Sequence, residues 1–298
     1  MRQVALLLLL AALVLVEPFC TTDSRAIQRA AGTSTSSSRL HIFGIGGGGG
    51  SARIPTSPAD RDNQAIAAVK AAISKPKTSN FPLIECEFPP LKELNKLGDG
   101  SLRSATEVDQ ANLAFCIKLV KAIAPIPFVS PKVWLLTSSA ATNAFVSKAQ
   151  AAAKGTAATV DTLRNGIPDE LQKGGGDVCI LLAPTGRPDY NLAQTIANNG
   201  NAAVMVNGLA KDPESVPNTA TMAYFLKPLT YNSMVSGFLI RSYPGPWTVL
   251  DAVTKQSLGT FSDQEILFKQ ANTPDLRAPG RLVQKATDDR AIAARNNR

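Results

Sequence analysis

The spacing of hydrophobic positions along the chain marks several expected helices. Apolar side chains three or four positions apart are typical of a helix with one buried face. Pro76 follows one such stretch and would end it, while Ser104 and Glu107 would form a capping box at the start of the longest. The sequence predicts helices of this kind over residues 61–75, 104–125, 140–154 and 190–200.

Short apolar runs separate these helices. The run DVCILLAP has no polar residue between Val178 and Pro184, which is typical of a strand buried on both faces. Strands that alternate with helices favour a parallel sheet covered by helices on both sides. The expected strands of this part lie at residues 81–88, 132–139, 177–184 and 201–208.

After Val216 the pattern changes, because strand-like runs follow one another without long helices between them. We interpret these runs as an antiparallel extension of the same sheet, ending in a hairpin and a short helix at 262–270. From Asn272 onward the chain is polar and basic, and we expect a loosely held tail. The extension would use residues 221–229, 237–245, 246–253 and 257–261.

The predicted fold is therefore a single three-layer α/β domain, with a mixed sheet that has a parallel core and an antiparallel C-terminal extension. This domain would span residues 54–275, and a basic polar tail would span residues 276–298.

Residues 1–53 have the composition of a targeting sequence. The apolar run at residues 4–16 is too short to span a bilayer and fits a signal peptide. The Ser-, Thr- and Arg-rich stretch behind it resembles a transit peptide, and the two together resemble the bipartite presequence of proteins sent to secondary plastids. Such presequences often have a Phe just after the signal-peptide cleavage point, and Phe19 fits that position. Pro18 departs from the pattern, because a small residue is expected there. The glycine-rich segment 44–51 lacks the Gly-Lys-Ser/Thr of a phosphate loop and fits a flexible seam. Plain secretion is the alternative.

The charge is concentrated at the two ends of the chain. The formal net charge is +8, but residues 1–53 carry five arginines against two acidic residues, and residues 281–298 carry five basic residues against two acidic ones. The folded middle is therefore close to neutral, and we expect no nucleic-acid partner.

The chain has few residues for nucleophilic or metal chemistry. Its single histidine, His41, lies in the expected presequence. Outside that presequence the cysteines are Cys86, Cys116 and Cys179, without a C-x-x-C pair, and we interpret them as buried structural thiols. We therefore expect no metal and no cofactor. Any catalysis would depend on Asp, Glu, Lys, Tyr or Cys side chains.

The order of several motifs resembles one known family. EFPP, GDGSLRSATEVDQANLAFCIKL, DVCILLAP, YFLKPL and SGFLIRSYPGPWTVLDA follow one another over about residues 58–275. This arrangement resembles the plastid and cyanobacterial family known as domain of unknown function 1995. The resemblance implies a plastid protein, since land-plant members include a factor needed for photosystem II accumulation. In one plant adenylate kinase a similar domain is appended to the kinase. The resemblance implies no catalytic residues for this chain, because none are established for the family.

Glu85 and Glu87 are two carboxylates on the same side of one predicted strand. They fit either a site that divides acid and base roles between two carboxylates or one solvent-facing edge of the strand, and we favour the edge.

A candidate ligand site lies where buried strands end, because ligands of open α/β sheets gather beyond the carboxyl ends of strands. In LAPTGRPDYN a strand meets a helix start, where Arg187 would add charge for an anion. The alternative is that Asp189 simply caps the helix. The candidate ligand-binding residues are Thr185, Gly186, Arg187, Asn207 and Gly208, with Thr137 and Ser138 at an earlier strand end.

YPGPW, residues 243–247, joins two strands. Aromatic side chains at a stiff loop fit a protein contact, so Tyr243, Pro244 and Trp247 are candidate partner-binding residues. The alternative is an aromatic pair packed over the end of the sheet.

Together these patterns favour a non-catalytic auxiliary protein of a secondary plastid, in the stroma or at the thylakoid surface. It would act in photosystem assembly or maintenance by binding a protein partner such as a photosystem subunit. The basic tail fits peripheral contact with the thylakoid. The alternative is a small-molecule or nucleotide-binding α/β enzyme with its site at the strand carboxyl ends.

Overall fold

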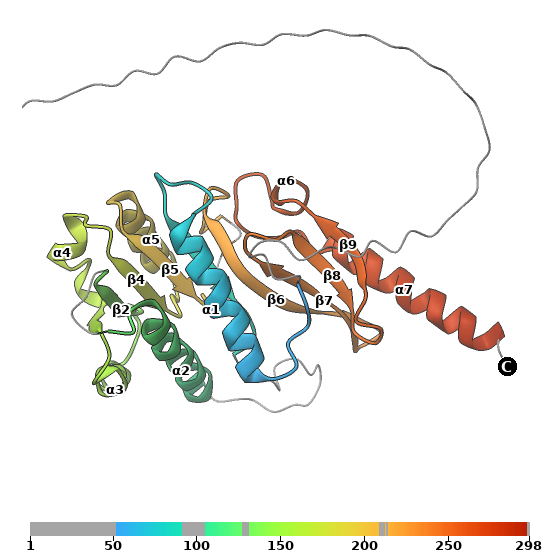
Figure 1. Ribbon diagram of the computed structural model, residues 1–298, viewed down its shortest axis with the longest axis horizontal. Coiled ribbons are helices and arrows are strands. Elements are labelled where there is room, and N and C mark those ends of the chain that lie inside the picture. The colour runs from blue at the N-terminus through green and yellow to red at the C-terminus, as the bar shows by residue number, and fades with distance from the viewer. Residues whose placement is uncertain (1–51, 91–104, 127–130, 209–211, 213, 297–298) are drawn as a thin grey trace, which may run out of the picture. The chain divides into compact units, whose positions relative to one another are not determined.

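The computed structural model describes residues 52–90, 105–126, 131–208, 212 and 214–296. One nine-stranded sheet, in the order β3-β2-β4-β5-β1-β6-β7-β8-β9, runs through this part of the chain (Figure 1). The strands are β1 (Leu83–Glu87), β2 (Val133–Thr137), β3 (Ala158–Thr162), β4 (Val178–Leu182), β5 (Ala202–Val206), β6 (Thr221–Tyr231), β7 (Met234–Ser242), β8 (Trp247–Asp251) and β9 (Ser257–Phe261).

The sheet has two halves of different character. Strands β1 to β5 pair in parallel, and β6 joins them by a parallel pairing with β1. From β6 onward every pairing is antiparallel. The predicted mixed sheet, with a parallel core and an antiparallel C-terminal extension, is therefore confirmed.

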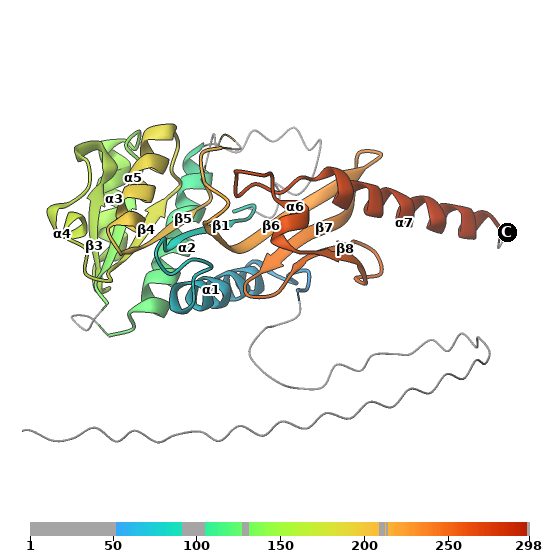
Figure 2. The same cartoon turned by 90° about the horizontal axis from the view of Figure 1, so that it is seen from above.

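Helices cover both faces of the sheet, which gives three layers (Figure 2). On one face, α1, α2 and α3 pack with the alternate strand residues Ile84 and Cys86. On the other face, α4 and α5 pack against the parallel half, and α6 and α7 pack against the antiparallel half. The helices are α1 (Pro58–Ser74), α2 (Ala105–Ile123), α3 (Asn143–Ala153), α4 (Asp169–Gln172), α5 (Arg187–Asn198), α6 (Asp263–Ile266) and α7 (Arg277–Asn296), with a 3-10 turn at Leu163–Asn165.

Two of the local differences from the sequence prediction concern the parallel half of the sheet. Helix α5 begins three residues early, because Gly186 adopts an extended conformation as the N-cap and Pro188 fits the first turn. Strand β3 was not predicted, since its sequence ATVDT lacks an apolar run, and as an edge strand it is only partly buried. The presequence before residue 52 and the capping residue Ser104 lie outside the described residues.

The expectation of a loosely held tail is wrong for Arg277–Asn296, which form α7. Val283 is 1% exposed and packs on the sheet at Gly237, where a Cβ atom would clash with the Val283 side chain. At Gly259 an added Cβ would lie 2.8 Å from Leu282 Cδ1. Arg290 forms an ion pair with the buried Asp251. These two glycines therefore let the helix lie close to the strands.

Candidate functional site at the carboxyl ends of the parallel strands

The topology places two pairs of strands where a ligand crevice is expected. After β2 the chain continues into α3 on one face, and after β4 it continues into α5 on the opposite face. Likewise α2 follows β1 on the first face, while Val216 and Ala220, after β5, pack with α5 on the second. Neighbouring strands whose connections diverge in this way leave a crevice at their carboxyl ends.

Asp189 occupies the crevice between β2 and β4. Its side chain is fully buried, and its carboxylate accepts hydrogen bonds from Ser138 Oγ at 2.6 Å, Thr185 N at 3.0 Å and Ser139 N at 3.1 Å. The prediction that Asp189 caps α5 is wrong in detail, because Gly186 is the N-cap and makes no side-chain cap. Instead, the hydrogen bonds of Asp189 with Ser138 and Ser139 connect the start of α5 to the loop after β2.

Because of these hydrogen bonds, the start of α5 is a poor binding site for an anion. The Asp189 carboxylate already accepts from the Thr185 N–H, and an added anion would face its negative charge. Burial raises the pKa of Asp189, but the hydrogen bonds from Ser138, Ser139 and Thr185 lower it by more, so the net pKa is below its usual range. The carboxylate therefore stays ionised near neutral pH.

The predicted residues at this strand end do not share one pocket. Thr185 and Ser138 line a pocket of about 140 Å³ beside the loop between β2 and α3. Arg187 is exposed and lines a separate pocket with Asp212 and Glu214. Two carboxylates beside Arg187 do not favour an anionic ligand there. Gly186 serves the helix as its N-cap.

A larger pocket of about 460 Å³ lies at the carboxyl ends of β1 and β5. It contains Asn207 and Gly208, the other two predicted residues. Most of its wall is apolar, and Glu87 and Lys227 contribute the charged groups. The described residues that line it are Glu87, Phe88, Pro89, Pro90, Val108, Asn112, Asn207, Gly208, Leu226, Lys227 and Pro228.

Asn207 and Asn112 form the polar part of this pocket. Asn207 has a positive φ of 48°, a conformation that asparagine tolerates better than most residues. Its Oδ1 accepts a hydrogen bond from Phe88 N at 2.8 Å, and its Nδ2 donates to Asn112 Oδ1 at 2.8 Å. Asn112 is fully buried, and its Nδ2 has no hydrogen-bond partner among the described residues.

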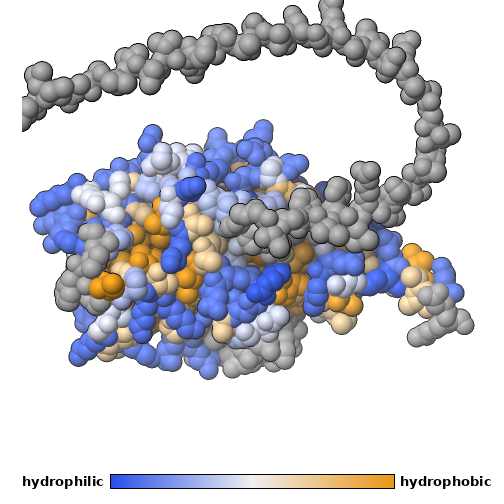
Figure 3. Space-filling model, viewed as in Figure 1, coloured by the Kyte–Doolittle hydropathy of each residue, from blue (hydrophilic) through white to orange (hydrophobic). Residues whose placement is uncertain are grey.

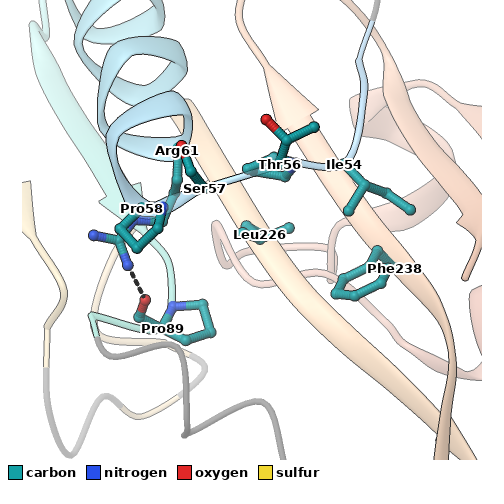
Figure 4. Close-up of a pocket in the computed structure, with 9 residues that line it drawn as sticks. Ile54, Thr56, Ser57, Pro58, Arg61, Pro89, Leu226 and Phe238 are labelled. Atoms are coloured by element: carbon teal, nitrogen blue, oxygen red, sulfur yellow. Dashed lines mark hydrogen bonds between the residues drawn. The ribbon is translucent and has the colours of Figure 1, made fainter.

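A second pocket, of about 210 Å³, adjoins the first and shares Pro89 and Leu226 with it. Figure 4 shows Ile54 and Phe238 at one end of this pocket and Arg61 at the other. Arg61 donates to Pro89 O at 2.8 Å and to Pro90 O at 2.9 Å, and its guanidinium lies 4.6 Å from the centre of the Phe88 ring. Arg61 therefore fixes the chain directly after β1.

The prediction that Glu85 and Glu87 form a solvent-facing edge is wrong for Glu85. Strand β1 lies in the middle of the sheet, and Glu85 is 5% exposed. Asn272 Nδ2 donates to Glu85 Oε2 at 2.6 Å, which ties the segment before α7 to the central strand. Glu87 is half-buried and lines the larger pocket. The two side chains therefore have different surroundings on one face of the strand.

The aromatic residues of YPGPW pack on the body of the protein. Trp247 is fully buried, and its Nε1 donates to Asp263 Oδ1 at 2.8 Å, so the prediction that Trp247 contacts a partner is wrong. Tyr243 is half-buried, and its hydroxyl donates to Lys75 O at 2.8 Å. The Tyr243–Pro244 peptide bond is cis, and Pro244 is exposed. Partner binding at Tyr243 and Pro244 stays a prediction.

The interpretation of the three cysteines as buried thiols is confirmed. Cys86, Cys116 and Cys179 are all free and buried, and burial raises the pKa of each thiol. Such thiols stay protonated and are poor nucleophiles. In the described part of the chain no group of three or more His, Cys, Asp or Glu side chains is placed to hold a metal ion. No helix in that part combines the length and apolar character needed to cross a membrane.

Comparison with known proteins places this fold in a family. Residues 55–277 match the family described as Domain of unknown function (DUF1995), and the chain belongs to it. The motif order in the sequence pointed to the same family. No curated protein and no solved structure matches the chain.

Proposed function

We propose that this protein is a non-catalytic auxiliary protein of a secondary plastid, and that it promotes photosystem assembly or maintenance by binding a protein partner. Three features support this proposal. The first is the composition of residues 1–53, which resembles a bipartite plastid presequence. The second is the resemblance of the chain to plastid proteins, one of which supports photosystem II accumulation. The third, and the one that carries the proposal, is the end of α7.

The last turns of α7 extend beyond the strands (Figures 1 and 2). Val283 and Arg290 hold the first part of the helix to the sheet, but residues 291–296 are all exposed. This segment reads AIAARN, and Ile292 is 54% exposed. Figure 3 shows hydrophobic residues at this end of the helix. An exposed apolar helix end is a suitable contact for a groove on another protein.

Charges on α7 would assist contact with an anionic surface. Arg281 and Arg295 are exposed, whereas Lys285 pairs with Asp289 at 3.2 Å. Peripheral contact of this helix with the thylakoid surface would therefore be weak by itself, and we propose it only as an aid to partner binding.

The test compares two isoleucines of similar exposure. Ile292→Glu places a charge at the proposed contact, and Ile126→Glu places the same charge after α2, where Ile126 is 63% exposed. Because both sites are exposed, each change should alter the unfolding free energy by less than about 0.5 kcal/mol. The tagged variants are purified from isolated plastids, and the amount of each photosystem subunit that co-purifies is divided by the amount of tagged protein recovered. We expect at least about a tenfold loss for Ile292→Glu, the effect of a central contact residue.

Equal recovery of photosystem subunits with wild type, Ile292→Glu and Ile126→Glu would contradict the proposed contact. So would an equal loss with both variants, because that result would reflect added negative charge and not the end of α7.

The alternative, a small-molecule-binding protein with its site at the strand carboxyl ends, is favoured by one observation. That observation is the pocket at β1 and β5 with the unpaired Asn112 amide.

A further inference from the structure

We propose that the pocket at the carboxyl ends of β1 and β5 binds a small, mainly apolar molecule that presents one carbonyl oxygen to the side-chain amide of Asn112. This proposal does not depend on partner binding by α7.

The orientation of both asparagine amides follows from one backbone group. The Phe88 N–H points at the side chain of Asn207, so the atom that it meets must be the Oδ1 acceptor. The NH2 group of Asn207 then faces Asn112, whose nearer atom must be the Oδ1 acceptor. The Asn112 NH2 is thereby turned away from Asn207. Exchanging oxygen and nitrogen in either amide would bring two donors or two acceptors together.

An unpaired Asn112 amide is costly. A buried donor without a partner costs about 1–3 kcal/mol, and Asn112 is fully buried. Its Nδ2 has no partner in the described part of the chain, although Asn112 lines the pocket. A ligand oxygen that accepts from this group would recover the lost hydrogen bond. The donor therefore selects ligands that carry an acceptor atom.

The remaining wall defines the rest of the ligand. Phe88, Val108 and Leu226 offer apolar side chains, and three prolines give the wall little freedom to collapse. A volume of about 460 Å³ lies within the range of sites for small organic ligands. An apolar body of that size fits this lining better than a sugar or a nucleotide would.

The charges favour a neutral acceptor over an anion. The donor on Asn112, which lines the pocket, is an uncharged amide. Lys227 lines the pocket as well, but its side chain is exposed to solvent, where its charge is screened. Burying a carboxylate or phosphate beside an uncharged donor and an apolar wall would carry a large desolvation cost, whereas a ketone or amide carbonyl would not.

The test uses two probes that differ only in the carbonyl group. Benzylacetone has a phenyl ring, a short chain and one ketone, and n-butylbenzene replaces the ketone by a methylene. Both are titrated into the full chain labelled with nitrogen-15, and the Asn112 side-chain amide is followed by NMR. We expect saturable binding of benzylacetone with a downfield shift of the Asn112 amide proton. Its affinity should exceed that of n-butylbenzene by about tenfold, which corresponds to one recovered hydrogen bond.

Asn112→Asp, assayed at a pH where the new carboxyl is ionised, removes the donor and keeps the oxygen that Asn207 Nδ2 requires. In this variant the preference for the ketone should disappear. Asn191→Asp makes the same change at an exposed position on α5 and should leave the preference intact. The comparison of the two probes on the wild-type protein does not depend on whether Asn112→Asp folds. Equal affinity for both probes, or no change in the Asn112 amide resonance with either, would overturn the proposal.

Discussion

We expect Asp189→Ala to lower the free energy of unfolding by about 3–5 kcal/mol. The substitution removes the carboxylate that accepts from Ser138 Oγ, Ser139 N and Thr185 N. Each of these donors would lose a strong, charge-assisted bond inside the crevice between β2 and β4. Urea unfolding followed by circular dichroism measures the change. Asp289→Ala is the control, since Asp289 is exposed and makes one surface ion pair, and its loss should change stability by less than about 0.5 kcal/mol.

The pH dependence gives the same prediction an independent check. Burial raises the pKa of Asp189, and the hydrogen bonds that it accepts lower it by more, so the folded-state pKa lies below that of an unfolded chain. The carboxylate therefore stabilises the fold above pH ~3.9, the usual pKa of aspartate, and this contribution is lost as the pH falls through the lower folded-state pKa. The stability gap between wild type and Asp189→Ala should shrink in acid. A gap that is small at neutral pH, or constant with pH, would contradict this role for Asp189.

Val283→Asp is expected to release α7 from the sheet or to cost about 3–5 kcal/mol. Val283 is 1% exposed and packs in a cluster with Met222, Phe225 and Trp247. Removing it loses about 1.5–3 kcal/mol of apolar burial, and an unpaired carboxylate there adds a further desolvation cost. Hydrogen exchange of the α7 amides distinguishes the two outcomes, because release of the helix exposes its amides while the sheet stays protected.

The matched control for α7 is Lys285→Asp. It introduces the same carboxylate on the same helix at an exposed position and removes one surface ion pair with Asp289. Its effect on stability should stay below about 1 kcal/mol. If Val283→Asp and Lys285→Asp behave alike, α7 does not depend on its contact with the sheet.

The sequence predicted the elements whose pattern is local. Strand β4 is an uninterrupted apolar run, and all five of its residues are buried, as expected. Helix α7 could not be predicted in this way, because its buried residues are only Pro279 and Val283 and charged residues lie on both sides of them in the sequence. What fixes this helix is the space above Gly237 and Gly259, which belongs to strands distant in sequence.

In the candidate site, too, the residues set by a local pattern were predicted and those that depend on distant residues were not. Asn207 and Gly208 were found because they follow a buried strand, and the structure places both in the larger pocket. The roles of Asp189 and Glu85 depend on Ser138 and Asn272, which lie 51 and 187 positions away, and no local pattern contains that information.

Asn112 was missed, although the sequence holds a signal for it. It occupies the buried stripe of α2, four positions after Val108 and four before Cys116. A lone amide among apolar positions at helical spacing indicates a buried polar contact.

The most direct measurement of the central claim is the photosystem II content of plastids in cells that lack this protein. If it promotes photosystem assembly through a protein contact at the end of α7, the content should fall in its absence. Wild type and Ile126→Glu should restore the content, whereas Ile292→Glu should accumulate in the plastid as a folded protein and fail to restore it. An unchanged photosystem II content in cells without the protein would contradict the proposed function.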